Sequence, residues 1–254
     1  MMIFKKLFYI ICTFFIVNNL FAQQGFIQKQ KSFQKVEQVF KLKDDTLRKQ
    51  FEKAGLSFPP KQIYLRSFKY DSELEVWIKE KHLDTFKLFK TYKVCALSGS
   101  LGPKRIEGDF QVPEGFYYIN EFNPKSMYHL SLGINYPNAS DLLLSDSLKP
   151  GNEIYVHGGC ITVGCIPIKD AQIEELYMLA SYVKENGQDF IPVHIFPVRY
   201  NVKKSYEYLA LQSKYNESYQ LFAVTIQDVF DYFNQYKKLP IIAIDAKGNY
   251  SVVQ

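Results

Sequence analysis

The chain of 254 residues has a formal net charge of +5, with 31 basic against 26 acidic residues, and 47% of it is hydrophobic. This hydrophobic content supports a packed core and excludes disorder over most of the length. The charge excess is too small to indicate a nucleic-acid partner.

The first residues have the pattern of a secretory signal peptide. Lys5 and Lys6 precede the apolar run Leu7–Val17, and Ala22 offers a small residue at a cleavage site. The run is shorter than the ~20 apolar residues that cross a bilayer. We therefore predict that residues 1–22 are removed on export to the periplasm or cell envelope, leaving a chain of net charge +3 with no transmembrane span.

Residues 23–60 are predicted to be a helical lead-in. The segment 23–50 is polar and lysine-rich with a weak helical stripe of apolar residues. A second helix would be capped by Asp45 or Thr46 and would end at Gly55. We expect both helices to be solvated on the surface.

Residues 61–200 are predicted to be the catalytic domain. From Gln62 to Leu97 the hydrophobic pattern has a period of two, which indicates strands joined as hairpins. Asp141–Ser147 is predicted to be a loop that forms part of a lid. Later in the domain we expect a helix capped by Asp170 and ended by Gly187, and then a buried strand, 190–196, in which His194 is a packed core residue.

Residues 201–254 form a C-terminal extension with a different composition, rich in tyrosine, lysine and glutamine. Within it we predict helices at 205–212 and 225–236 and a strand at 240–245. The sequence of this segment does not indicate a function.

The stretch 154–168 carries the chemistry. A short apolar strand delivers His157 into a glycine-rich turn, and Cys165 follows eight residues later, directly after Gly164. A nucleophilic thiol needs a base within reach and backbone N–H groups aimed at the oxyanion. We predict that Cys165 is a catalytic nucleophile and that His157 is its base.

These residues also resemble a known active-site signature. His157-Gly158 followed by Thr162-Val163-Gly164-Cys165 is similar to the signature of the L,D-transpeptidases with a YkuD-type catalytic domain, and is closest to the YafK-like branch with its short His-to-Cys spacing. The segments around Pro113-Glu114-Gly115 and Tyr136-Pro137-Asn138 resemble the same branch. The resemblance extends over residues 64–200 and implies an α+β fold, a mainly β catalytic domain with peripheral helices.

The resemblance implies peptidoglycan chemistry. Cys165 would form a thioester with the third residue of a stem peptide, release D-alanine and pass the acyl group to an amine on another stem peptide or on an envelope protein lysine. His157 would act as general base and acid and would lower the thiol pKa by pairing with the thiolate. The Gly158 backbone would orient the imidazole, the Gly164 and Cys165 amides would form the oxyanion hole, and no metal or cofactor is required.

Substrate contacts are predicted for His129, Gly159 and Thr162, although a structural hydrogen bond is an equally good interpretation of His129. The sequence departs from the family pattern at two positions. Pro167 stands where most members have an arginine, and Val163 where many have a second histidine. These differences bear on the substrate and the acceptor, not on the nucleophile.

Three other functions fit parts of the pattern. An L,D-endopeptidase or amidase that hydrolyses cross-links or peptidoglycan–protein links uses the same residues, and only the acceptor differs. A non-catalytic wall-binding scaffold would leave the reactive pair unused. A metal site would take His157, Cys160 and Cys165, but it lacks a Cys-x-x-Cys pair.

The signal peptide contains Cys12, so three cysteines remain after its removal: Cys95, Cys160 and Cys165. In an oxidising compartment, an odd number leaves at least one thiol unpaired or paired with another chain. A Cys95–Cys160 bridge would leave Cys165 free. A Cys160–Cys165 bridge, or no bridge, remains open from sequence alone.

Overall fold

The computed structural model describes residues 25–253, and the predicted signal peptide lies outside them. None of the helices in this range combines the length and the apolar character that a membrane crossing requires.

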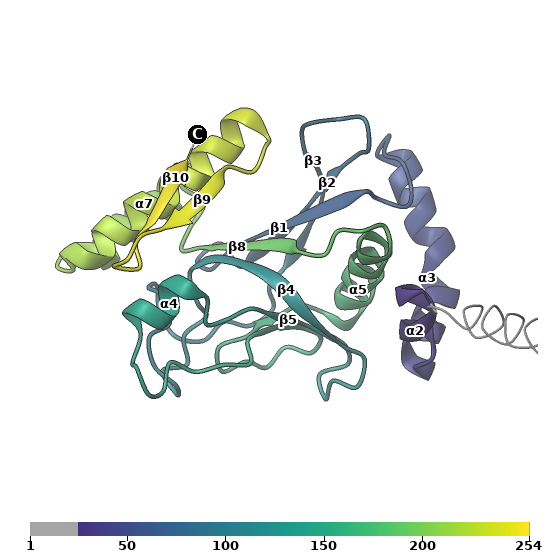
Figure 1. Cartoon of the computed structure of the whole chain (residues 1–254), viewed down its shortest axis with the longest axis horizontal. Helices are drawn as coiled ribbons and strands as arrows, with labels where there is room; N and C mark the ends of the chain where they lie inside the picture. Colours follow the sequence, from purple (N-terminus) through teal and green to yellow (C-terminus); the bar gives the residue numbers. More distant parts are fainter. Residues whose placement is uncertain (1–24, 254) are drawn as a thin grey trace, which may run out of the picture.

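A curled eight-stranded sheet forms the centre of the molecule, with the strand order β3-β2-β1-β8-β4-β5-β6-β7 (Figure 1). The β1–β8 and β6–β7 pairs are parallel and the other pairs are antiparallel. An isolated bridge between Val94 and Ile168 joins the two ends of the sheet. The strands are β1 (Gln62–Phe68), β2 (Glu73–Lys79), β3 (Lys87–Lys93), β4 (Gly115–Asn123), β5 (Ser131–Ile134), β6 (Tyr155–His157), β7 (Ile166–Pro167) and β8 (Ile191–Phe196).

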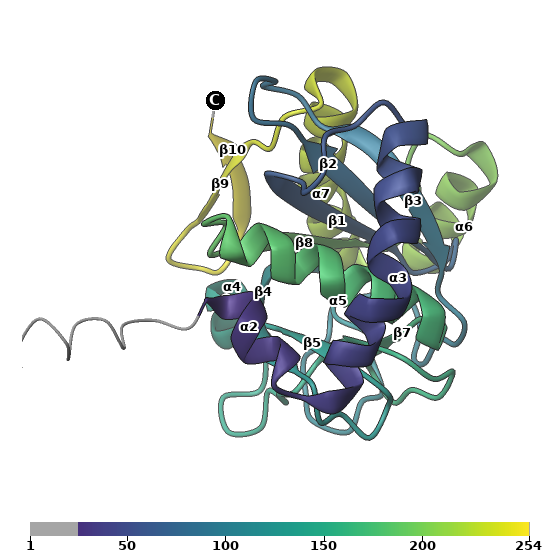
Figure 2. The same ribbon diagram turned by 90° about the vertical axis from the view of Figure 1, so that its right-hand side faces the viewer.

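Helices α2 (Phe26–Lys31), α3 (Gln34–Lys53) and α5 (Asp170–Glu185) cover one face of this sheet, as Figure 2 shows. The apolar stripe predicted for α5 is buried in the main core. The α3 prediction was wrong in two ways. No break occurs at Asp45, so α3 is one continuous helix, and it is not a solvated surface helix, because Val36, Phe40, Leu47 and Phe51 are buried against the sheet.

The C-terminal extension covers part of the opposite face. It contains α6 (Lys203–Ser213), α7 (Glu217–Tyr236) and a separate hairpin of β9 (Ile241–Ile244) and β10 (Tyr250–Val253). Phe230 packs on Phe68 and Phe196, and Phe233 packs on Tyr64 and Trp77. His194 is buried as predicted, and its Nδ1 lies 2.7 Å from the Tyr64 hydroxyl.

The segment predicted as a loop at 141–147 begins instead inside a helix, α4 (Ala139–Leu144). The Asn138 side chain accepts from the Asp141 amide, and the Asp141 carboxylate accepts from the Asn138 amide. This reciprocal capping fixes a helix of only six residues, which is too short to leave a periodic pattern in the sequence.

Buried charges join the extension to the sheet. The Glu75 carboxylate accepts from Arg66, from Arg199 and from the Trp77 indole N–H, at 2.7–2.8 Å. Arg66 also donates to Asn234 of α7 at 2.9 Å. Both Arg66 and Glu75 are 3% exposed, so neither has water available to replace the other.

Replacing Glu75 by Ala should therefore lower the free energy of unfolding by about 3–5 kcal/mol, because it leaves a buried guanidinium unpaired. Urea denaturation measures the change. Asp45→Ala, which removes the exposed pair with Lys49 on α3, is the matched control and should leave the midpoint unchanged. Equal effects of the two substitutions would contradict this account of the network.

Candidate active site

The predicted base His157 lies in β6, and the predicted nucleophile Cys165 directly precedes the neighbouring parallel strand β7. Val156 pairs with Ile166 and His157 with Pro167, which places Cys165 opposite Tyr155, one residue before β7 begins. Val156 faces the main core, so Tyr155 and His157 face the other way, and Cys165 shares their side. The register thus brings Cys165 and His157 together as diagonal neighbours on one face.

The imidazole of His157 is held in one orientation. Its Nδ1 lies 2.6 Å from the carbonyl oxygen of Gly158. A carbonyl only accepts, so Nδ1 carries the proton and, in the neutral ring, Nε2 carries the lone pair. The centroids of the Tyr128 ring and the imidazole are 4.8 Å apart. His157 is only 2% exposed, and this burial lowers the pKa of its imidazole.

The Cys165 thiol has two backbone partners. The Tyr155 amide donates to Sγ at 3.4 Å, and the thiol donates to the Glu153 carbonyl at 3.7 Å. Within residues 25–253 no hydrogen bond joins the sulfur to the His157 ring, and burial raises the thiol pKa. Both pKa shifts favour a neutral thiol beside a neutral imidazole over the expected thiolate–imidazolium pair.

Gly158 is required by close packing. A Cβ at this position would lie 2.7 Å from the Asp170 carboxylate and 2.9 Å from the Tyr128 carbonyl. The backbone that orients His157 can thus pass under the segment that carries Tyr128 only if residue 158 has no side chain.

The turn before the nucleophile is braced by Thr162. Its hydroxyl donates to the Cys165 carbonyl at 2.8 Å and accepts from the Gly164 amide at 3.1 Å. The Thr162 hydroxyl, for which a substrate contact was predicted, is therefore used in hydrogen bonds within the turn. The Gly164 amide is occupied by one of these bonds. Gly164 has φ +139°, a conformation that strains any residue with a side chain, and a Cβ there would lie 3.1 Å from the Gln111 carbonyl oxygen.

The His129 ring faces acidic residues of α5. Its Nε2 lies 2.7 Å from Glu174 of α5 and its Nδ1 lies 3.9 Å from Asp170, which favours the structural interpretation. Gly159 donates its amide to Asp170 at 2.8 Å. Asp170 is not the helix N-cap as predicted, because Lys169 has that position; its carboxylate instead holds the turn after His157.

A disulfide joins Cys95 to Cys160, and Cys165 is the free thiol among the described cysteines. The bridge ties the turn between His157 and Cys165 to the chain that follows β3. The metal alternative is contradicted, since Cys160 is consumed in the bridge. Over residues 25–253 no three His, Cys, Asp or Glu side chains are grouped to hold a metal ion.

Three non-glycine residues with positive φ surround the site. Glu153 (φ 54°) accepts from the thiol, His129 (φ 72°) follows the Tyr128 that covers His157, and Phe110 (φ 56°) precedes the Gln111 that packs on Gly164. Strained backbone of this kind concentrates at functional sites. Sequence reasoning missed Tyr128, Glu153 and Tyr155 because these contacts depend on backbone geometry and register, which leave no motif.

Comparison with known proteins gives the family. Residues 72–195 match the model of the YkuD L,D-transpeptidase catalytic domain. YafK of Escherichia coli strain K12, named as an L,D-transpeptidase, is 31% identical over 195 residues, or 75% of this chain and 73% of YafK. The chain belongs to the L,D-transpeptidase family. The resemblance is confirmed, and the protein is an enzyme of a peptidoglycan-modifying class.

A second relative and two solved structures are also similar to this chain. YafK of Escherichia coli O157:H7 matches with the same identity and coverage. The helical cell shape determining protein Pgp2 of Campylobacter jejuni is 18% identical, with a TM-score of 0.44 over 76% of this chain and 77% of Pgp2. Bd1075 of Bdellovibrio bacteriovorus is 22% identical, with a TM-score of 0.39 over 70% of this chain and 63% of Bd1075.

Alkylation of Cys165 by iodoacetamide should follow a single titration with a midpoint above the pKa of an ordinary cysteine. Only the thiolate reacts, and the folded protein raises the thiol pKa, so the rate at neutral pH should increase when urea unfolds the chain. Mass spectrometry of the labelled protein gives the rates. A plateau of fast reaction at acid pH would indicate a resting ion pair and contradict the neutral pair.

The double substitution Cys95→Ser with Cys160→Ser should lower the free energy of unfolding by about 4 kcal/mol, because the bridge closes a loop across 65 residues. Urea denaturation with and without dithiothreitol measures it. Under reducing conditions the wild type and the variant should have the same free energy of unfolding. A difference that persists there would show that lost side-chain packing, rather than the missing bridge, causes the loss of stability.

Proposed function

We propose that the protein is a peptidoglycan L,D-transpeptidase in which Cys165 is the nucleophile and His157 the general base and acid. The observation that carries this proposal is the same-face placement of His157 in β6 and of Cys165, the residue directly before β7, with His157 Nδ1 fixed on the Gly158 carbonyl. That bond leaves Nε2 as the ring nitrogen able to accept a proton.

The first half-reaction acylates the enzyme. His157 Nε2 takes the thiol proton as Sγ attacks the carbonyl carbon of the third stem residue, and the tetrahedral intermediate forms. When the intermediate collapses, the imidazolium protonates the departing amine, and D-alanine leaves. The product is a thioester on Cys165, and His157 is again neutral.

The second half-reaction transfers the acyl group. An acceptor amine attacks the thioester carbonyl, His157 removes a proton from that amine, and the Cys165 thiolate leaves and is reprotonated. The acceptor would be an amine of another stem peptide or of an envelope protein lysine. Water in place of the amine would give the hydrolytic reaction of an endopeptidase or amidase.

A starting state of two neutral groups fits this sequence of steps. The lowered pKa of His157 keeps Nε2 unprotonated at neutral pH, and the raised thiol pKa keeps the proton on sulfur until substrate arrives. Hydrogen bonds of catalytic groups commonly tighten only when substrate binds, so the Glu153 carbonyl would give up the thiol at that stage.

The backbone amide of Cys165 is the better donor for the oxyanion hole. The Gly164 amide, which the sequence also suggested, donates to Thr162 Oγ1 in this structure. A shift of the Thr162 hydroxyl on substrate binding would be needed to release it.

We further propose that the enzyme acts outside the cytoplasm. The chain begins with a signal-peptide pattern, and the Cys95–Cys160 disulfide suits an oxidising compartment, in which such bridges persist.

Residues 23–254 should convert disaccharide-tetrapeptide muropeptides into cross-linked dimers with release of D-alanine, and Cys165→Ala should be inactive. Mass spectrometry of the products gives the answer. Thr91→Ala on β3, an exposed substitution on another strand, controls for handling. Cleavage products without dimers would assign the hydrolase instead. Inactivity of both proteins on muropeptides and on protein-linked peptidoglycan would favour the non-catalytic scaffold.

A further inference from the structure

A cavity of about 750 Å³ lies between the catalytic domain and the C-terminal extension. One wall comes from the segment 101–111, and the other from the α6–α7 connection, α7 and the β9–β10 hairpin. The second wall lies beyond residues 72–195, which match the family's catalytic domain. The cavity therefore has one wall inside the stretch that matches the catalytic domain and one wall outside it.

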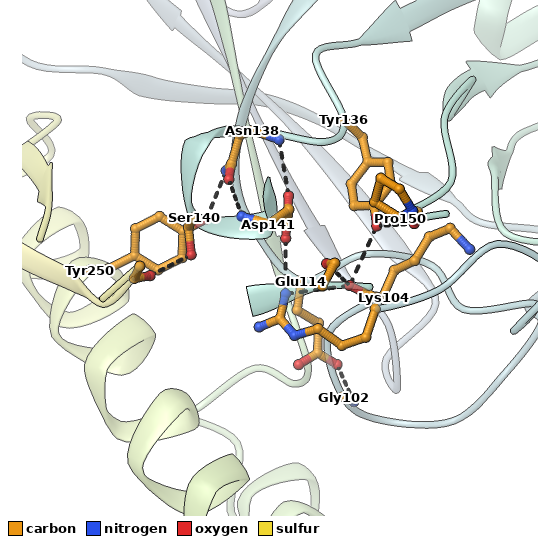
Figure 3. Close-up of polar contacts among 12 residues, drawn as sticks. Gly102, Lys104, Glu114, Tyr136, Asn138, Ser140, Asp141, Pro150 and Tyr250 are labelled. Carbon is orange, nitrogen blue, oxygen red and sulfur yellow. Dashed lines mark hydrogen bonds and ion pairs between the residues drawn. The ribbon is translucent and has the colours of Figure 1, made fainter. Parts of the chain in front are cut away.

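The walls are held by buried hydrogen bonds that join the two parts of the chain (Figure 3). Asn138 Nδ2 donates to the Tyr250 hydroxyl at 2.7 Å, and Ser140 Oγ donates to the Gly248 carbonyl at 2.6 Å. Gly248 has φ +86° and sits so close to α4 that a Cβ would lie 2.9 Å from Leu144. The β9–β10 turn is thus fixed against the catalytic domain and does not act as a loose flap.

The charged groups beneath the cavity are paired with one another. Glu114, which is fully buried, accepts from the Gly102 amide at 2.7 Å and from the Tyr219 hydroxyl at 3.1 Å, and it pairs with Lys69 at 3.0 Å. Lys104 pairs with Asp109 at 2.5 Å. These four charges therefore cancel locally.

Arg105 is the only charged side chain among the described residues that line the cavity. Within the described residues its side chain donates two hydrogen bonds, both from Nη1: one to the Asp141 carboxylate at 3.1 Å and one to the Lys104 carbonyl at 3.4 Å. The guanidinium carbon also lies 5.8 Å from the centroid of the Phe222 ring, within the range of a cation–π contact. Nε and Nη2 keep their N–H donors for a ligand, in the planar fork that matches a carboxylate.

The cavity adjoins the catalytic turn. Gln111 lines it, and the carbonyl of the same residue packs against Gly164, next to Cys165. A single stretch of backbone therefore separates the cavity from the nucleophile.

We propose that this cavity is a subsite for a carboxylate of the stem peptide, with Arg105 as the cation that binds it and the C-terminal extension as its outer wall. The inference rests on the proposed function, since it takes the peptide that acylates Cys165 as the ligand. The side-chain amides of Gln212, Asn216 and Asn249 on the outer wall suit a peptide chain beside the carboxylate.

The test measures binding of a disaccharide-tetrapeptide to the Cys165→Ala protein by isothermal titration calorimetry, against the same ligand with its carboxylates amidated. Gln212 is exposed on the outer wall, so its charge can be changed without disturbing the Arg105–Asp141 pair. Gln212→Glu should weaken binding of the acidic ligand about fivefold, and Gln212→Lys should strengthen it about as much. Arg105→Gln should weaken it about tenfold.

Two comparisons make the result specific. Ala210→Glu places the same charge on α6 outside the cavity and should leave the affinity unchanged. The amidated ligand should not respond to the charge at position 212. Alkylation of Cys165 by iodoacetamide, measured in proteins that retain this cysteine, should proceed at the wild-type rate in the Gln212 variants, which shows that the reactive pair is intact.

The outcomes separate this inference from the proposed function. If the wild type turns over muropeptides but substitutions at Gln212 and Arg105 do not change the affinity for the tetrapeptide, the subsite is rejected and the proposed transpeptidase activity stands. Charge-dependent binding without turnover would support the subsite and reject the transpeptidase. Absence of both binding and turnover would overturn both.

Discussion

The parallel pairing of β6 with β7 is the constraint on which the site depends. Two short strands hold it, and they would fray alone, but the Val94–Ile168 bridge closes the sheet beyond them and the Cys95–Cys160 disulfide anchors the turn between them. Because the register is fixed, Cys165 and His157 occupy one face without any direct bond between their side chains. The sheet thus brings the two side chains near each other, and in the proposed mechanism substrate binding has only to align the thiol with the imidazole.

Each element around the pair contributes one further restriction. The Gly158 carbonyl selects the tautomer of His157, Tyr128 excludes water from the ring, and the Tyr155 amide and Glu153 carbonyl hold the sulfur. Burial shifts the pKa values of both groups toward their neutral forms, so in the proposed mechanism the charge separation occurs during attack on the substrate. An un-ionised thiol is protected from adventitious oxidation, which proceeds through the thiolate.

Sequence alone predicted the fold class, most elements and the central pair of residues, because strand periodicity and the His-Gly to Gly-Cys spacing are local signals. It misjudged α3 as solvated, since its weak stripe gives no sign of the sheet surface that receives Val36 and Phe40. It missed α4, whose six residues depend on a capping box. It could not assign Thr162 or His129, whose bonding partners are set by tertiary contacts with the Gly164 turn and α5.

The central claim is that Cys165 attacks the stem peptide with His157 as its base. The most direct measurement is the intact mass of the protein after brief exposure to a disaccharide-tetrapeptide, followed by peptide mapping of the adduct. We predict an added mass equal to the ligand less D-alanine, located on Cys165, absent in Cys165→Ala and strongly reduced in His157→Gln. An adduct on another residue, or one that forms at the wild-type rate in His157→Gln, would contradict the account.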